Sequence, residues 1–185
     1  INSIWYREVI SIFQNKIFKI DLYSPDSKIN IIKEFKNFLI NGGFPEIINI
    51  EDELRNRILQ EYFNVMIYRD IVERYQVKNL IVLKYFIKRI FESITNPLSV
   101  NRIYNELKSQ NYKIGKNLLY DFLDEMESIY LAIPLKKYAN SLLKQELGEK
   151  KYYCIDNGLL NAVTFKLSGD YGKLLENLVI LEFIK

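Results

Sequence analysis

The spacing of apolar residues along the chain predicts a mostly helical protein. In several segments apolar side chains recur every three to four positions, which places them on one face of an α-helix. The segments with this pattern are 29–41, 52–76, 80–93, 100–110, 115–128, 159–163 and 172–185. Gly42 and Gly43 end the first, and Pro97 follows the third. Both are stop signals, because glycine favours the turn after a helix and proline cannot continue one. Ser99 is a good N-cap for the segment 100–110.

A second pattern, with strand-like alternation, predicts a small β component. Residues 16–23 alternate before a Ser-Pro-Asp turn, and residues 129–138 and 151–156 flank a polar connection at 140–149. Helices 80–93, 100–110 and 115–128 therefore precede a two-stranded hairpin, which is the order of a winged helix-turn-helix. The expected fold class is mainly α with a small β component: a helical region followed by a winged helix-turn-helix with a two-stranded wing. A domain boundary is expected near residues 77–80.

Composition narrows the chemistry. The chain of 185 residues has no histidine, which excludes Ser-His-Asp and Cys-His catalysis and most zinc sites. We therefore predict no catalytic residue and no metal site. A single cysteine, Cys154, favours a reducing, cytoplasmic setting. Without an apolar run of about 18 residues, no membrane partner is expected.

Candidate DNA contacts lie in the second helix of the helix-turn-helix and in the hairpin. Lys113 and Lys116 could reach phosphates, Asn117 could pair with an adenine edge, and Tyr120 follows one turn later. The hairpin adds a basic set: Lys136, Lys137, Lys144, Lys150 and Lys151. Against DNA, the same helix carries Asp121, Asp124, Glu125 and Glu127, and winged helices also dock proteins. The partner therefore stays open between DNA, another protein and a second copy of the chain.

Four phrases resemble one protein family in order and spacing. They are Gly42–Glu46, Tyr68–Tyr75, Lys151–Leu159 and Gly172–Val179, and they look like the region that follows the nucleotide-binding core of archaeal and bacterial AAA-type ATPases. The resemblance implies a remnant of the ATPase core and a helical lid at 1–78, a winged helix at 79–165, and the start of a truncated C-terminal domain at 166–185. It implies a fragment, as does the beginning at Ile1 without a methionine.

The resemblance also implies an ATP-binding parent protein in which this segment couples nucleotide state to a DNA or protein partner. The chain has no Gly-x-x-x-x-Gly-Lys-Ser/Thr loop to bind phosphates, so by itself it is expected to bind no cofactor and not to hydrolyse ATP. The alternatives are a stand-alone winged-helix DNA-binding regulator and a protein-interaction module without a nucleic-acid role.

Candidate nucleotide contacts, if the resemblance holds, are Gly42, Gly43, Phe44, Pro45, Arg69 and Arg74. Taken without the resemblance, the glycines are a helix end, and the arginines belong to a surface salt-bridge network in which Asp70 and Arg74 pair at i, i+4. In the last helix, the resemblance suggests the entry to a nuclease-like fold near Glu176, Asn177 and Glu182. The simpler interpretation, surface acids on an amphipathic helix, is preferred.

Overall fold

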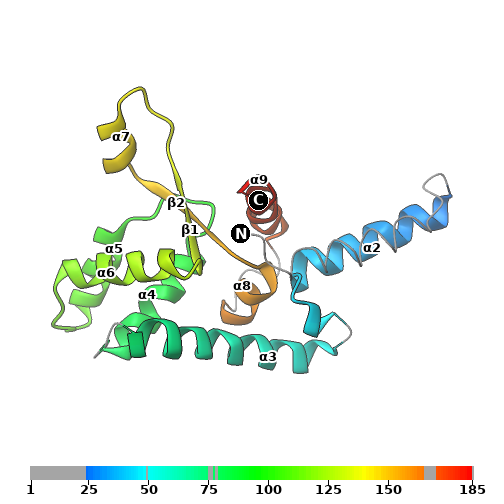
Figure 1. Cartoon of the computed structure of the whole chain (residues 1–185), viewed down its shortest axis with the longest axis horizontal. Helices are drawn as coiled ribbons and strands as arrows, with labels where there is room; N and C mark the ends of the chain where they lie inside the picture. Colours follow the sequence, from blue (N-terminus) through cyan, green and yellow to red (C-terminus); the bar gives the residue numbers. More distant parts are fainter. Residues whose placement is uncertain (1–23, 49, 75–76, 78, 165–169, 185) are drawn as a thin grey trace.

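The computed structural model describes residues 24–184 except 49, 75–76, 78 and 165–169, and within these ranges it is mainly helical with one two-stranded antiparallel sheet. The expected strand at 16–23 lies outside the described residues. The elements, shown in Figure 1, are α2 (Pro25–Asn41), η1 (Pro45–Ile47), α3 (Asp52–Val65), η2 (Met66–Glu73), α4 (Leu80–Glu92), α5 (Val100–Ser109), α6 (Lys116–Ser128), β1 (Ala132–Lys136), α7 (Leu142–Leu147), β2 (Lys150–Cys154), α8 (Asn157–Val163) and α9 (Tyr171–Ile184).

Local signals explain where several helices begin and end. The Oγ of Ser99 accepts a hydrogen bond from the Arg102 amide at 3.3 Å, so it caps α5 as expected. Asn79 caps α4 in the same way through the Val82 amide. At the end of α2, Gly42 has a φ of 78°, a conformation that favours glycine.

Two segments differ from the expected elements. The long helix predicted over 52–76 begins as α3, but from Met66 to Glu73 it is a π-helix, η2. Hydrogen bonds in a π-helix join residues five apart, so each turn there holds more residues than a turn of α-helix. The connection predicted at 140–149 contains the short helix α7, which lies at the far end of the β1–β2 hairpin (Figure 1).

A continuous hydrophobic core runs through most of the described chain. The three helices α4, α5 and α6 contribute its centre, where Phe86, Phe91 and Phe122 are almost fully buried. Ile67 and Ile71 of η2 belong to the same cluster as Val82 of α4, so the core crosses the expected boundary near residue 78. A smaller cluster joins Ile47, Leu59 and Ala162.

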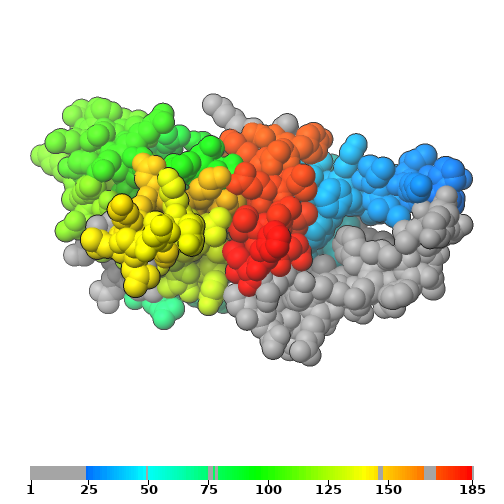
Figure 2. Space-filling model, turned by 90° about the horizontal axis from the view of Figure 1, so that it is seen from above, coloured from blue at the N-terminus to red at the C-terminus, as the bar shows by residue number. Residues whose placement is uncertain are grey.

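Helix α8 occupies the centre of the other half of the molecule. It packs against α2, α3 and α9, and α9 also contacts β2. Figure 2 shows α9 at the surface, between α2 on one side and the β1–β2 hairpin on the other. Several of its apolar side chains remain exposed: Tyr171, Leu175, Val179, Phe183 and Ile184.

Candidate nucleic-acid interface

In the β1–β2 hairpin (residues 132–154), strand β2 makes backbone contacts along both of its edges. On one edge β2 pairs with β1 in an antiparallel register from Ala132↔Cys154 to Lys136↔Lys150. On the other edge, the segment between α4 and α5 lies against it. The Leu98 amide donates to the Lys150 carbonyl at 3.0 Å, and Pro97 and Lys151 form an isolated bridge. The hairpin therefore projects from a fixed base.

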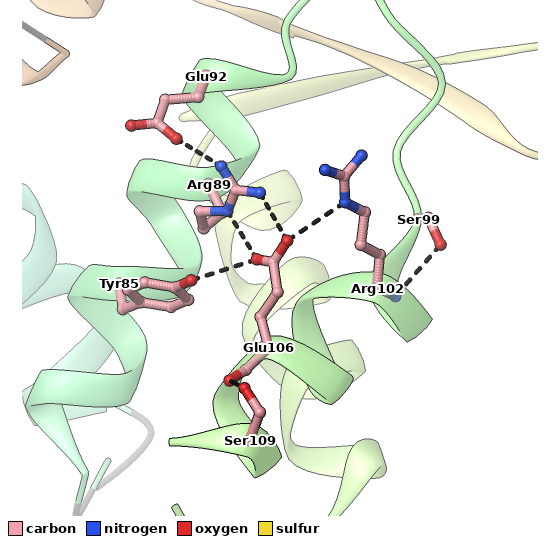
Figure 3. Close-up of polar contacts among 7 residues, drawn as sticks. All are labelled: Tyr85, Arg89, Glu92, Ser99, Arg102, Glu106 and Ser109. Atoms are coloured by element: carbon pink, nitrogen blue, oxygen red, sulfur yellow. Dashed lines mark hydrogen bonds and ion pairs between the residues drawn. The ribbon is translucent and has the colours of Figure 1, made fainter.

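A polar network holds α4 against α5 (Figure 3). The Glu106 carboxylate accepts from Arg89 Nε and Nη2, both at 2.9 Å, from the Tyr85 hydroxyl at 3.2 Å and from Arg102 Nε at 3.2 Å. Arg89 also reaches Glu92 at 2.7 Å. Burial acts to raise the pKa of Glu106, but the Arg89 guanidinium outweighs it and lowers that pKa. This network fixes the helix pair that supports α6.

The candidate DNA contacts of α6 lie in the N-terminal half of the helix. Asn117 and Tyr120 are exposed, and Lys116 Nζ lies 5.6 Å from the centre of the Tyr120 ring, a cation–π distance. Lys113 is exposed just before the helix begins. Asp121 and Asp124 are exposed one and two turns later. The free face of α6 is therefore basic and polar at its beginning and acidic towards its end.

The predicted basic residues of the hairpin divide into two groups. At the base, Lys151 Nζ lies 3.1 Å from Glu176 of α9, and Lys150 Nζ lies 3.9 Å from Glu127 of α6. These two lysines hold the hairpin on its neighbours. Lys136, which lies opposite Lys150, is exposed, as are Lys137 and Lys144 nearer the tip.

Charge is concentrated in this hairpin. Residues 136–151 contain five lysines and two glutamates, a net charge of +3. The whole chain has 26 basic and 23 acidic residues, also +3, so the rest of the chain, with 21 of each, is neutral. Such a local excess is the electrostatic feature of a surface that meets a polyanion.

Glu125 was predicted as one of the acids of α6 that face away from DNA or oppose it, and the structure buries it. Its Oε2 has no hydrogen-bond partner among the described residues. Burial, then Asp121 and Asp124 on the same helix, raise the pKa of Glu125 to about 7. Its position three residues after Phe122 and one before Met126, both buried, is the signal that could have revealed this.

A buried polar cluster connects four elements around α8. The Asp156 carboxylate accepts from the Gly43 and Leu159 amides, both at 2.8 Å. Asn157 Nδ2 donates to the Leu39 carbonyl and to the Leu174 carbonyl, both at 2.9 Å. The cluster therefore links the end of α2, the turn after β2, α8 and α9.

Asn177 completes this cluster from α9. Its Oδ1 accepts from the Cys154 amide at 2.8 Å, and its Nδ2 donates at 2.9 Å to the Cys154 carbonyl and to Asn157 Oδ1. The side chain is fully buried. Its amide pairs with both backbone groups of Cys154 at the end of β2, as the backbone of a neighbouring strand would. A polar residue between the apolar positions Leu174 and Leu178 is the sequence signal for such a role.

Of the two predicted arginines, Arg69 lies on η2 and Arg74 directly follows it, and both are exposed. Arg69 donates to its neighbour Asp70 at 2.9 Å, which raises the pKa of Arg69. The pairing of Asp70 with Arg74 stays a prediction.

Among the residues that the structure describes, no group of three or more His, Cys, Asp or Glu side chains is placed to hold a metal ion. No helix in the same part of the chain combines the length and the apolar character that crossing a membrane requires.

Comparison with known proteins places the chain in a family. The model of a family described as Domain of unknown function (DUF8612) matches residues 32–170. The chain belongs to this family. It is 35% identical over 161 residues to uncharacterized protein MJ1544 of Methanocaldococcus jannaschii, which covers 86% of this chain and 36% of that protein. An uncharacterized protein of Haemophilus influenzae is 27% identical over 86% of this chain and 40% of its own length. No solved structure matches.

Membership of the DUF8612 family corrects the expected relationship to AAA-type ATPases, which is wrong. Two assignments depended on that relationship and are wrong for the same reason: an ATP-binding parent protein, and a chain that is a fragment of such an ATPase. The chain spans less than half the length of these two relatives. Three of the four phrases that suggested the resemblance supply the buried cluster around Asp156. The amide of Gly43, one of the candidate nucleotide contacts, is hydrogen-bonded to that carboxylate.

Proposed function

We propose that the chain is a winged-helix module that binds duplex DNA through the N-terminal half of α6 and the β1–β2 hairpin. The order α4, edge segment, α5, α6, β1, β2 supports the winged helix, since β2 lies between β1 and the 95–98 segment. A β-hairpin that merely follows three helices would have no reason to pair with the segment between the first two.

The observation that carries the proposal is the position of the charge. The entire net charge of the chain is located on the hairpin that a winged helix would place beside the bound duplex. Lysines there would neutralise phosphates and supply salt-dependent affinity. The first turn of α6 would present Asn117 to a base edge, with Lys113 and Lys116 on the flanking backbone.

The acids of α6 limit how the helix can dock. Asp121 and Asp124 share its exposed face but lie beyond the first turn. Insertion of α6 along its whole length would bring these carboxylates against phosphates, which is unfavourable. Only the first turn of α6 would therefore enter the groove of the DNA.

The test is fluorescence anisotropy of a labelled duplex over a series of salt concentrations. Wild-type affinity should fall steeply as salt rises, and the double variant Lys137→Ala/Lys144→Ala should lower the slope of log K against log salt by about 2. The matched control is Lys33→Ala/Lys36→Ala on α2, which removes the same charge from exposed positions. Equal effects of the two variants, or no salt-dependent binding, would reject the proposal.

A second candidate function is protein association through α9. Tyr171, Leu175, Val179 and Phe183 are exposed and recur every four residues, so they form one apolar stripe. Sedimentation velocity over a range of concentrations tests self-association through this stripe. A reversible dimer that Val179→Lys abolishes would support it, and a monomer at every concentration would remove it.

A further inference from the structure

The tip of the hairpin is unusually apolar for a projecting loop. Tyr138, Leu142 and Leu143 are 85%, 78% and 68% exposed. Single exposed apolar residues are normal on protein surfaces, but three within six positions on a protruding segment indicate a contact site. Figure 1 shows α7, which carries both leucines, at the end of the hairpin away from the helices.

The tip is also folded. The Gln145 side-chain amide donates to the Ala139 carbonyl at 2.6 Å, which closes the loop, and the Gln145 backbone amide donates to the Ser141 carbonyl at 3.0 Å. A side chain on Gly148 would meet the Lys144 carbonyl at 2.8 Å, so the chain turns back tightly after α7. A closed loop of this kind presents its leucines without a large ordering cost on binding.

The charge around the apolar tip identifies the partner. Lys137 and Lys144 flank the leucines and are exposed, within a segment of net charge +3. Apolar side chains with a lysine on either side, Lys137 before them and Lys144 after them, match a polyanion that can be opened to expose apolar faces. Duplex DNA has that chemistry, because its stacked bases lie behind two rows of phosphates.

We infer that the hairpin tip acts as a minor-groove wedge, in which Leu142 and Leu143 enter a base step and bend the duplex. This inference rests on the proposed DNA binding and specifies its mode. The B-form minor groove is about 6 Å wide, so a closed loop with two leucines enters only where the groove widens. Leucine is among the side chains that unstack base steps in this way, and phosphate contacts by the neighbouring lysines offset the unstacking cost.

The experiment measures bending and affinity separately. Energy transfer between dyes at the two ends of a short duplex should rise when the wild-type chain binds, since bending shortens the end-to-end distance. The chain should also bind a duplex with a central mismatch about tenfold more tightly than a matched one, because the mismatched step is already partly unstacked. Leu142→Ala/Leu143→Ala should lose both effects while keeping salt-dependent binding.

The control variant is Leu54→Ala, which removes an exposed leucine of α3 and should change neither measurement. Circular dichroism and thermal melting should be unchanged in both variants, because the removed side chains are exposed. Binding without bending, and with equal affinity for matched and mismatched duplexes, overturns the wedge while the proposed function stands. No salt-dependent binding at all overturns the proposed function itself. Loss of binding to anionic vesicles in the leucine variant, with duplex bending and the preference for the mismatched duplex both unchanged, would also overturn the wedge and assign the tip to lipid.

Discussion

The carboxylate of Asp156 accepts a hydrogen bond from the backbone amide of Gly43 at 2.8 Å, across 113 positions of sequence. The contact joins the end of α2 to the turn before α8, and both partners are buried. Burial raises the pKa of Asp156, while the amides of Gly43, Leu159 and Gly158 oppose that rise. The Asp156 carboxylate therefore has to lie close to the backbone at the end of α2. Gly42, the residue before Gly43, permits this because it has no side chain.

Replacement of Gly42 by alanine should destabilise the fold strongly. The new Cβ would collide with the Asp156 carboxylate, and Gly42 has a φ of 78° with a ψ of −170°, a conformation essentially confined to glycine. We expect a loss of about 3 kcal/mol in the free energy of unfolding. Urea denaturation followed by circular dichroism measures it.

The control for this prediction is Gly115→Ala at the beginning of α6. Gly115 has a φ of −82°, and no atom lies within 4 Å of the position its Cβ would take. Its cost should stay within about 1 kcal/mol, the scale of a cap exchange. Similar losses of unfolding free energy in the two alanine variants would show that the contact with Asp156 does not decide whether position 42 tolerates a side chain.

The helices and the hairpin could be predicted because their signals are local. The spacing of apolar residues identified α2, α4, α5, α6 and both strands within a few positions, and Ser99 caps α5 as predicted. Helix α7 was missed, since its six residues are too few to display helical periodicity. The π-helical η2 could not be foreseen either, because an i, i+4 pattern looks nearly the same over one turn.

Long-range polar contacts explain the errors about function. Asp156, Asn157 and Gly158 resemble an ordinary turn, and Gly42 with Gly43 resembles an ordinary helix end. Only the fold reveals that they meet. Glycine, proline and asparagine recur wherever a chain turns or approaches closely, so phrases rich in them can match between unrelated families. Three of the four phrases behind the mistaken relationship to ATPases contain such residues.

Protonation of Glu125 should make stability fall as pH rises from 4.5 to 7. Its pKa in the folded chain is about 7, above the ordinary value of 4.5, so in this window the folded state holds a proton that the unfolded state has lost. Glu125→Gln should remove the effect. The variant should match wild type below pH 4.5 and be more stable by about 3 kcal/mol above pH 7.

Chemical denaturation at pH 4, 6 and 8 measures this difference. Glu53→Gln, an exposed glutamate of α3, is the control for the change in charge. A constant gap between wild type and Glu125→Gln across the three pH values would contradict the prediction.

The thiol of Cys154 should be almost unreactive in the folded chain. It is fully buried, and burial raises the pKa of Cys154 to about 12 from an ordinary 9.0. At pH 8 the thiolate fraction is then about a thousandfold smaller than in the unfolded chain. Labelling with a thiol-reactive disulfide reagent should be complete within minutes in urea and should follow the rate of global opening without it. Rapid labelling in native buffer would contradict the buried position.

The contact between Arg89 and Glu106 should contribute more than the one between Arg102 and Glu106. Arg89 makes two hydrogen bonds to the carboxylate, and both side chains are less than one-third exposed, whereas the Arg102 side chain is 76% exposed. Double-mutant cycles with Arg89→Met, Arg102→Met and Glu106→Gln measure the two coupling energies by urea denaturation at pH 7. We expect about 1.5 kcal/mol for Arg89–Glu106 and below about 0.5 kcal/mol for Arg102–Glu106.

The same cycle has a pH signature. The pKa of Glu106 is lowered in the folded chain, so its contribution is present above the ordinary carboxyl pKa and is lost as pH falls through the lowered value. The Arg89–Glu106 coupling should therefore disappear in strong acid, and Glu106→Gln should then cost no more than any exposed glutamate substitution. Equal coupling energies for the two arginines at pH 7 would mean that exposure does not set the strength of this network.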